Sequence, residues 1–322
     1  MELLRAESLK KFFEVRKTFR SGGHVLKAVD GIDFALREDS VLALVGESGC
    51  GKSTVARLVL RLMEPTSGAV LFKGKNIFSM DRAEIKAFRK SVQIIFQDPF
   101  ASLNPRRTVY DTISEPLLIH RLAGRPGMKD AVVGVLEKVG LGAETLNRYP
   151  HEFSGGQRQR ICIARALAVS PELIVADEPL SALDVSIQAQ IINLLTDLKK
   201  QTKISFLFIS HDLRVVQYFS DAVGVMYLGK IVEYAGTDGL FEKPFHPYTE
   251  VLLASAPKIR PDGWKKIRSA PLQGEVPSPI NIPPGCPFHP RCPRRFEPCD
   301  RIVPELKESH GRLVSCHLWN PY

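Results

Sequence analysis

The sequence predicts an α/β fold in which a largely parallel sheet carries a helical insertion and a small C-terminal extension. Short, β-branched apolar runs, as expected for strands buried on both faces, alternate with stretches of helical spacing. A glycine-rich loop joins one of these strands to the helix that follows it. The extension has a different composition, because 15 of the 23 prolines lie from Pro244 onward. These observations define a regular body up to about residue 240 and a chemically distinct tail.

The predicted elements follow from local spacing and from turn residues. Consecutive apolar residues predict strands at 41–45, 70–72, 94–96, 173–176 and 204–209. Helical spacing predicts helices at 54–63 and 187–198, and the stretch from 98 to about 167 is mostly helical. Two short segments, 223–227 and 230–234, are joined by Leu228-Gly229 and predict a hairpin.

Composition narrows the classes of protein. Of the 322 residues, 44% are hydrophobic and 25% are charged, which excludes a disordered or fibrous chain. No apolar run approaches the ~18–20 residues that span a bilayer, and the first residues lack the features of a secretory signal. We therefore expect a protein of the cytoplasm. The net charge of +9 suits phosphates, anionic lipid or nucleic acid and does not choose among them.

A phosphate-binding loop follows the strand at 41–45. Gly46-Glu47-Ser48-Gly49-Cys50-Gly51-Lys52-Ser53-Thr54 matches the pattern G-x-x-x-x-G-K-[ST] and opens a helix. Glycines let successive backbone N–H groups point into one concavity, and the helix N-terminus adds partial positive charge. Lys52 supplies a full charge to the outer phosphates, and the Ser53 hydroxyl is a ligand for Mg²⁺.

Further motifs follow in a fixed order. They are Gln97 after a strand, the signature segment Phe153-Ser154-Gly155-Gly156-Gln157-Arg158-Gln159-Arg160, the carboxylates Asp177 and Glu178 after a strand, Ser181-Ala182-Leu183-Asp184, and His211. Each has an ordinary reading by itself, such as a surface glutamine, a turn or a capping histidine. In this order, over residues 10–235, they closely resemble the ATP-binding cassette (ABC) ATPases.

This resemblance implies a P-loop NTPase fold with a RecA-like core, an antiparallel β subdomain and a helical subdomain at about 98–167. The nucleotide-binding domain would span 1–240. It also implies an ATPase that binds ATP and Mg²⁺ and works as a head-to-tail pair. In such a pair each ATP lies between the phosphate loop of one subunit and the signature segment of the other.

The resemblance also assigns roles to single residues. The catalytic residues would be Glu178 as the general base or water-orienting carboxylate, His211 at the γ-phosphate, Gln97 and Lys52. Mg²⁺ would be held by Ser53, Gln97 and Asp177. The residues expected at the nucleotide are Phe12, Gly46, Glu47, Ser48, Gly49, Cys50, Gly51, Lys52, Ser53, Thr54, Gln97 and Asp177, with Ser154, Gly155, Gly156 and Gln157 at the ATP of the partner and Asp184 at the subunit junction.

Two positions depart from the family pattern. The signature segment begins with Phe153 where leucine is common, at a position we expect to be a packing position. The adenine-stacking aromatic is commonly tyrosine, whereas here the stretch reads Lys10-Lys11-Phe12-Phe13. Phe12 aligns best, and Phe13 is the alternative; either phenyl ring can stack on a base.

The tail carries a second candidate site. Phe245-His246-Pro247-Tyr248-Thr249-Glu250-Val251-Leu252-Leu253 and the cysteines after it resemble the C-terminal extension of oligopeptide and dipeptide importer ATPases, which assigns residues 241–322 to that extension. Four cysteines, Cys286, Cys292, Cys299 and Cys316, have the spacing C-x₅-C-x₆-C-x₁₆-C within the segment 286–316. In a reducing compartment such thiols suit a metal.

The subfamily resemblance implies a [4Fe–4S] cluster on these four cysteines. His289 and His317 keep a Cys₃His zinc site open as an alternative, and an unmetallated tail is a further one. The ATPase motifs lie elsewhere in the sequence, so we expect hydrolysis by the body to survive the loss of the metal.

The importer resemblance also implies partners and a location. The partners would be a second ATPase subunit, expected to be a paralogue, two membrane-spanning permease subunits and an extracytoplasmic peptide-binding protein, at the cytoplasmic face of the membrane. Nickel importers share much of this pattern, so nickel remains an alternative substrate. A soluble ABC ATPase acting on nucleic acid or ribosomes is the alternative from another class. It is disfavoured because the chain has one cassette and a modest insertion, and no nucleic-acid partner is expected.

Overall fold

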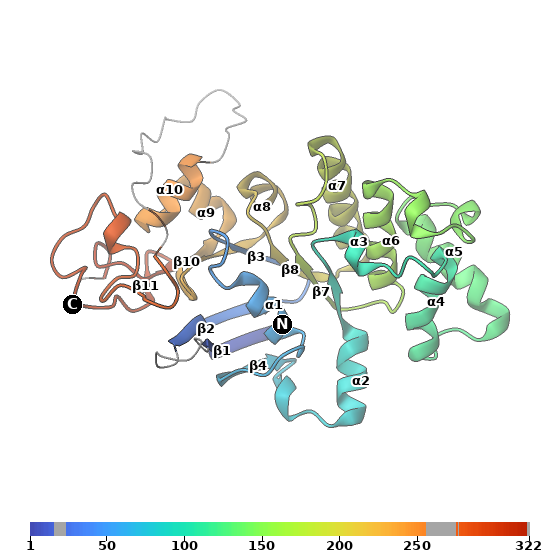
Figure 1. The fold of residues 1–322 in the computed structure, drawn as a ribbon, viewed down its shortest axis with the longest axis horizontal. Coiled ribbons are helices and arrows are strands. Elements are labelled where there is room, and N and C mark those ends of the chain that lie inside the picture. Colours follow the sequence, from blue (N-terminus) through green and yellow to red (C-terminus); the bar gives the residue numbers. More distant parts are fainter. Residues whose placement is uncertain (16–23, 256–274, 276, 321–322) are drawn as a thin grey trace. The chain divides into compact units, whose positions relative to one another are not determined.

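The computed structural model describes residues 1–15, 24–255, 275 and 277–320. The chain divides into two compact units, which are described separately. Unit 1 comprises Met1, Leu36–Val41 and Ser79–Ile209, and unit 2 comprises Glu2–Ala35, Leu42–Phe78 and Ser210–Tyr322. Figure 1 shows the elements of both, coloured along the sequence.

Unit 1 contains three parallel strands, β6 (Val92–Ile95), β7 (Leu173–Asp177) and β8 (Ser205–Ile209), in the order β8-β7-β6. Every residue of β8 is buried, and so are the first four residues of β7. Strands buried on both faces need no polar alternation, which explains why the sequence shows them as continuous apolar runs. All three confirm the predicted strands.

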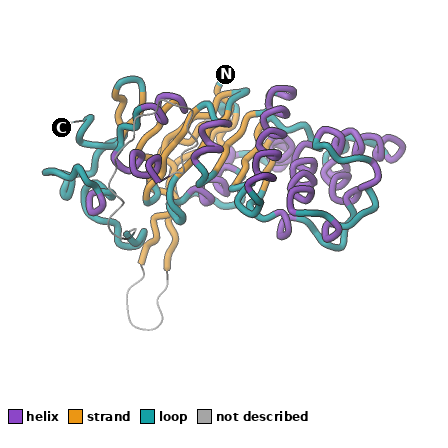
Figure 2. Tube along the Cα trace, turned by 90° about the horizontal axis from the view of Figure 1, so that it is seen from above, coloured by secondary structure: helices purple, strands orange, loops and turns teal. Residues whose placement is uncertain are grey.

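The helices of unit 1 include the predicted helical insertion. They are α2 (Arg82–Ser91), α3 (Pro99–Ser102), α4 (Val109–Ile119), α5 (Met128–Lys138), α6 (Gly155–Leu167) and α7 (Val185–Thr202), with short 3₁₀ turns between them. From α3 to α6 the described trace consists of helices and loops without strands (Figures 1 and 2). Helix α6 is the centre of this part, since it contacts α3, α4, α5 and α7 as well as β6.

Unit 2 contains an antiparallel sheet and a mixed group of strands. The antiparallel sheet has the order β2-β1-β4-β5, with β1 (Glu2–Val15), β2 (His24–Arg37), β4 (Ser67–Phe72) and β5 (Lys75–Asn76). The mixed group has the order β11-β12-β10-β9-β3, with β3 (Val41–Val45), β9 (Ala222–Tyr227), β10 (Lys230–Gly236), β11 (Lys307–Ser309) and β12 (Arg312–Val314). Strand β3 runs parallel to β9, and β9 and β10 form the predicted hairpin.

The helices of unit 2 are α1 (Lys52–Val59), α8 (Leu213–Phe219), α9 (Thr237–Glu242) and α10 (Pro247–Ser255). Helix α1 is shorter than the predicted 54–63, because Leu60 caps it and Arg61 has a left-handed φ of 50°. Among the described residues, none of the helices combines the length and the apolar character needed to cross a membrane.

The C-terminal extension is built onto strand β10. Strand β12 pairs with β10, and the carboxylate of Glu233 in β10 accepts the backbone N–H groups of Phe245 and His246, both at 2.9 Å. The ring of Phe245 stacks on Trp319 with centroids 4.0 Å apart. A buried carboxylate that accepts two N–H bonds is well satisfied, so Glu233 fixes the start of the extension.

Candidate nucleotide site and cysteine pocket

The phosphate loop leaves the buried strand β3 through conformations that only glycine tolerates. Gly46 has a φ of 149°, and a Cβ there would lie 2.2 Å from the carbonyl oxygen of Met226. Gly51 has a φ of 110°, and a Cβ there would lie 2.1 Å from the carbonyl oxygen of Ala28. Neither neighbour is a movable side chain, so both glycines are required for the loop to fold.

The loop holds its lysine in place. Lys52 begins helix α1 and is only 5% exposed. Its ammonium group donates to the carbonyl oxygens of Gly46 at 2.7 Å and Glu47 at 3.0 Å. Ser48 and Gly49, at the tip of the loop, are exposed, whereas Ser53 and Thr54 are half-buried. The result is a fixed cation at a helix N-terminus, as phosphate binding requires.

Cys50 fills a slot in this loop. It is buried, and burial raises the pKa of its thiol, although the nearby Lys52 opposes the shift. A thiol that stays protonated is a poor nucleophile. Cys50 therefore has a packing role rather than a reactive one.

In unit 1, the structure brings Gln97 and Glu178 together. The side-chain amide of Gln97 donates to the Glu178 carboxylate at 3.3 Å. Glu178 follows β7 with a left-handed φ of 47°, and its backbone N–H donates to the Ile209 carbonyl oxygen at 2.9 Å. Asp177, the last residue of β7, is half-buried. A non-glycine residue with positive φ is uncommon, and such strain concentrates at functional sites.

The signature segment forms the start of helix α6. Ser154 is its N-cap in a capping box with Gln157, and the Ser154 side chain is exposed. The side-chain amide of Gln159 donates to the Pro179 carbonyl oxygen at 2.8 Å, which ties α6 to the residue after Glu178. Phe153 is buried, as expected for a packing position.

Packing within this subunit requires glycine at position 156. A Cβ at Gly156 would lie 2.6 Å from Cγ2 of Ile187 in helix α7. At Gly155 the nearest atom, a methyl of Leu183, would lie 3.4 Å away. The contact between α6 and α7 therefore selects glycine at 156 before any ligand is considered.

The remaining predicted nucleotide residues occupy three other places. Asp184 is the exposed N-cap residue of α7, and its side chain makes no capping hydrogen bond there. His211 is exposed between β8 and α8. Phe12 and Phe13 are both half-buried on β1, with Lys27 5.7 Å and Lys11 5.2 Å from the respective ring centroids. The choice between the two rings stays open.

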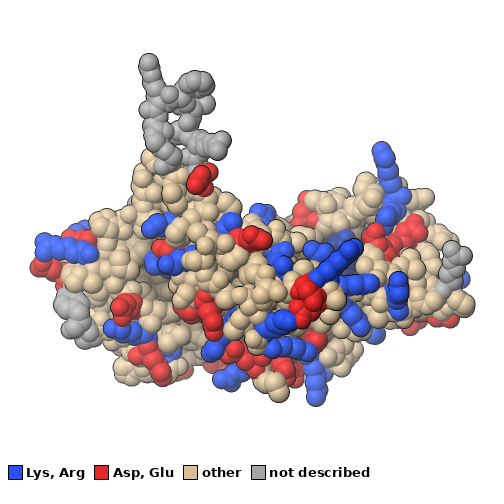
Figure 3. All heavy atoms as spheres, turned by 90° about the horizontal axis from the view of Figure 1, so that it is seen from below, with Lys and Arg blue, Asp and Glu red and all other residues tan. Residues whose placement is uncertain are grey.

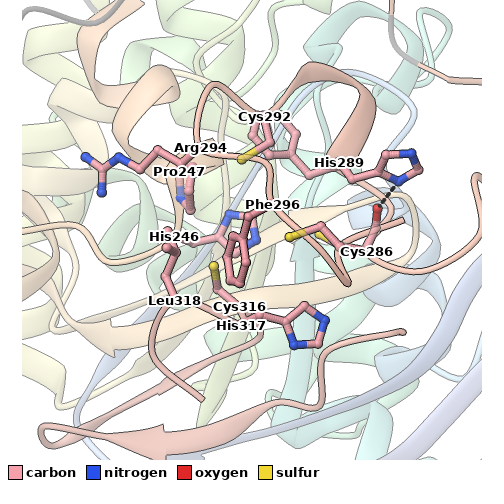
Figure 4. A pocket seen from close by; sticks show the side chains of 12 residues that line it. His246, Pro247, Cys286, His289, Cys292, Arg294, Phe296, Cys316, His317 and Leu318 are labelled. Atoms are coloured by element: carbon pink, nitrogen blue, oxygen red, sulfur yellow. Dashed lines mark hydrogen bonds between the residues drawn. The ribbon is translucent and has the colours of Figure 1, made fainter. Parts of the chain in front are cut away.

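The four cysteines of the extension share one pocket. Cys286, Cys292, Cys299 and Cys316 line it together with His246. Figure 4 shows the sulfur atoms of Cys286, Cys292 and Cys316 turned toward the same space. Burial raises the pKa of Cys286 to about 12 and that of Cys316 to about 11, and neighbouring cysteines add to each shift. Across the described residues, no three His, Cys, Asp or Glu side chains are arranged to hold a single metal ion.

The histidines around this pocket differ in their bonding. His289 Nδ1 lies 2.9 Å from the Cys286 carbonyl oxygen, and His317 Nε2 lies 2.9 Å from that of Ile302. Figure 4 shows both rings turned away from the sulfur atoms. His246 is fully buried, and burial lowers its pKa to about 3. Its Nδ1 accepts the Tyr248 N–H at 3.0 Å, so Nε2 carries the proton.

Sequence reasoning missed a contact between the extension and the phosphate loop. The guanidinium of Arg291 donates to both carboxylate oxygens of Glu47, at 2.8 and 3.0 Å. The backbone N–H of Glu47 donates to the Tyr248 hydroxyl at 2.9 Å. We expected hydrolysis not to depend on the tail, because the tail and the ATPase motifs are far apart in the sequence. In the fold the extension contacts the phosphate loop directly. The only sequence signal was an arginine between two of the cysteines.

Comparisons with known proteins agree with this arrangement. Residues 29–181 match the family described as ABC transporter, and residues 232–299 match the oligopeptide/dipeptide transporter C-terminal region. The chain is 50% identical to the oligopeptide transport ATP-binding protein AppF of Bacillus subtilis, over 99% of this chain and 98% of that protein. It is 46% identical to the dipeptide transport ATP-binding protein DppF of Escherichia coli, over 98% and 93%.

Solved structures show the same fold. CbiO1 from Clostridium perfringens, part of the ABC transporter complex CbiONQ, has a TM-score of 0.65 at 28% identity and covers 75% of this chain and 91% of its own. A dimeric ATP-binding cassette bound to ADP and phosphate has a TM-score of 0.64 at 24% identity, covers 73% and 99%, and supports the fold alone. The chain therefore belongs to the ATP-hydrolysing subunits of ABC transporters, in the oligopeptide/dipeptide transporter family.

Proposed function

We propose that this chain hydrolyses ATP to drive the import of dipeptides or oligopeptides through membrane permease subunits. The observation that carries the proposal is similarity over nearly the whole chain, extension included, to proteins named for peptide transport. The catalytic set is complete in the sequence, and Gln97 contacts Glu178. We expect the body, residues 1–240, to perform the hydrolysis and residues 241–322 to form the extension.

The proposed mechanism uses positioning and charge, as phosphoryl transfer requires. Lys52 neutralises the outer phosphates, and the loop from Gly46 to Thr54 cradles them with backbone N–H groups. The Glu178 carboxylate accepts a proton from the attacking water while Gln97 holds its second oxygen. His211 contacts the γ-phosphate. Ser53, Gln97 and Asp177 would hold Mg²⁺, which neutralises the developing charge when bound.

The pairing of two subunits extends this mechanism. We propose that Ser154, Gly155, Gly156 and Gln157 serve the ATP of a partner subunit, with Asp184 at the junction. The exposed Ser154 caps helix α6, so the positive end of that helix faces outward. We expect the partner to be a paralogue.

We propose that Cys286, Cys292, Cys299 and Cys316 are the ligands of a [4Fe–4S] cluster in the cysteine pocket. Four thiols line one space, and a Cys₄ set is the common ligand set of such clusters. The Cys₃His zinc alternative would require the ring of His289 or His317 to turn toward the sulfur atoms, because both rings point away from them in Figure 4. A metal bound by these thiols would help to order the extension, because it would link four separate positions of the segment.

Location follows from the partners. We propose peripheral attachment at the cytoplasmic face of the membrane, with two permease subunits and an extracytoplasmic binding protein completing the importer. Basic and acidic side chains are interspersed on the face shown in Figure 3.

Reconstitution tests the substrate class. The chain is assembled with its permease subunits, partner ATPase and binding protein in lipid vesicles, and ATP hydrolysis is measured with a tripeptide mixture or with Ni²⁺. Stimulation by peptides and not by Ni²⁺ is expected. Stimulation by Ni²⁺ alone would overturn the peptide assignment and favour the nickel alternative.

A further inference from the structure

The extension contacts the phosphate loop through a largely buried ion pair between Arg291 and Glu47. Arg291 is only 6% exposed at its side chain, and Glu47 is 23% exposed. Two parallel N–H···O bonds hold the pair, which is the strongest and most directional form of ion pair that side chains make. Surface ion pairs of the kind that contribute little are exposed and single-bonded, so this pair belongs to a different class.

Glu47 is held at its backbone as well as at its side chain. Its N–H donates to the hydroxyl of Tyr248 at 2.9 Å. The Tyr248 ring packs against Tyr227 and Phe288, with centroids 4.7 and 5.3 Å away. Phe288 belongs to the same cysteine-rich segment as Arg291. The second residue of the phosphate loop is therefore clamped from two sides by the extension.

The arginine sits inside the turn that carries the cysteines. Residues His289–Arg291 form a 3₁₀ turn between Cys286 and Cys292. The backbone N–H of His289 donates to the Cys286 carbonyl oxygen at 2.9 Å, and that of Cys292 donates to the His289 carbonyl oxygen at 3.3 Å. A displacement of either cysteine therefore moves Arg291.

The negative charge of Glu47 makes its ion pair with Arg291 relevant to nucleotide binding. Glu47 is an anion in a loop that binds phosphate anions, so an unpaired carboxylate there opposes nucleotide binding. Arg291 neutralises the carboxylate and draws it to the side of the extension. Lys52 is thereby left as the charge that faces the ligand, since its ammonium group bonds to two neutral carbonyl oxygens and to the Cys50 sulfur.

We propose that Arg291 is a positioning residue for the phosphate loop, through which the cysteine-rich segment sets the affinity of the chain for ATP. The inference rests on the proposed ATPase function. It implies that the state of the four cysteines, ordered or disordered, is transmitted to the nucleotide through the Arg291–Glu47 pair.

Nucleotide binding by the full chain tests the proposal, with a fluorescent ATP analogue and Mg²⁺-ATP as probes. Arg291→Gln leaves the Glu47 carboxylate unpaired and should weaken ATP binding about tenfold. The matched control is Arg295→Gln, in the same segment, which breaks the 3.0 Å pair with Asp300 and should leave affinity unchanged. In steady-state hydrolysis, Arg291→Gln should raise KM and leave kcat within about twofold.

A double variant separates positioning from a general structural role. Glu47→Gln combined with Arg291→Gln removes the unpaired charge and should restore affinity to within about threefold of the wild type. If Arg291→Gln weakened binding by unfolding the extension, the added Glu47→Gln change would not restore the affinity. If Arg291→Gln does not accumulate as folded protein, Arg291→Lys replaces it, since it keeps the charge but not the two parallel bonds.

The outcomes are distinct. Equal affinity of wild type, Arg291→Gln and Arg295→Gln would overturn the proposal while leaving the ATPase function intact. Weak binding in Arg291→Gln that the double variant does not relieve would also overturn it. A wild-type chain that binds no ATP would instead contradict the proposed function itself.

Discussion

Replacing Gly156 by alanine tests whether the signature segment is shaped by packing inside the chain. The new Cβ would lie 2.6 Å from Ile187 Cγ2, whereas ordinary contacts begin near 3.4 Å. Ile187 is β-branched in a helix and has one preferred χ1 rotamer, so its methyl group cannot swing away. Helices α6 and α7 must therefore separate. We expect the free energy of unfolding to fall by ~1–3 kcal/mol, the usual cost of overpacking.

Chemical unfolding followed by circular dichroism measures this loss. The matched control is Gly134→Ala in helix α5, where a Cβ would meet nothing within 4 Å. Alanine is a better helix former than glycine, so this control should be neutral or more stable by up to ~1 kcal/mol. A Gly156→Ala variant as stable as the control would refute the packing argument.

Ile187→Ala removes the methyl group that obstructs the new Cβ. Adding it to Gly156→Ala should cost less than the sum of the two single changes, because the overlap disappears. The rate of ATP hydrolysis by the double variant then distinguishes a packing role of Gly156 from a role in approaching the ATP of the partner. If packing alone selects the glycine, the double variant regains activity. If the backbone at 156 must also approach the ATP of the partner, stability is relieved while hydrolysis stays low.

Two further predictions concern the two candidate sites. Glu178→Gln keeps the shape of the side chain but cannot accept a proton, so steady-state hydrolysis should fall by ~10²–10⁴-fold while ATP affinity is retained; turnover within about threefold of the wild type would remove Glu178 from that role. Anaerobically purified wild-type protein should contain about four iron atoms per chain. Cys292→Ser should abolish this iron, whereas Cys162→Ala, outside the pocket, should retain it. Stoichiometric zinc in the wild type would refute the cluster.

The parallel strands were predictable because their burial leaves a direct trace in the sequence. Strands β7 and β8 are enclosed on both faces, so their apolar runs are continuous and end at polar residues such as Asp177. The glycine-rich loop was predictable for a related reason. Its glycines are required by the backbone, because a Cβ at Gly46 or Gly51 would collide with a carbonyl oxygen. Such constraints are local, so they appear as a motif.

The N-terminal strands show where this reasoning stops. Strands β1 and β2 span 14 residues each, yet charged and apolar residues mix along both. On β1 the register with β4 shifts between Glu7 and Lys10, which interrupts the alternation of period two. A pattern broken by a bulge matches neither the helix nor the strand template over a useful length. These strands become evident only through their pairing, of β1 with β4 and of β2 with β1.

The clamp on Glu47 was unpredictable for a different reason. Its partner Arg291 is 244 residues away, and an ion pair imposes no periodicity on either side of the contact. The cysteine spacing drew attention to a metal and left the arginine between Cys286 and Cys292 without a role. Yet that arginine lies in the turn on which the cysteines are placed. The four thiols and the guanidinium that pairs with Glu47 therefore share one structural element.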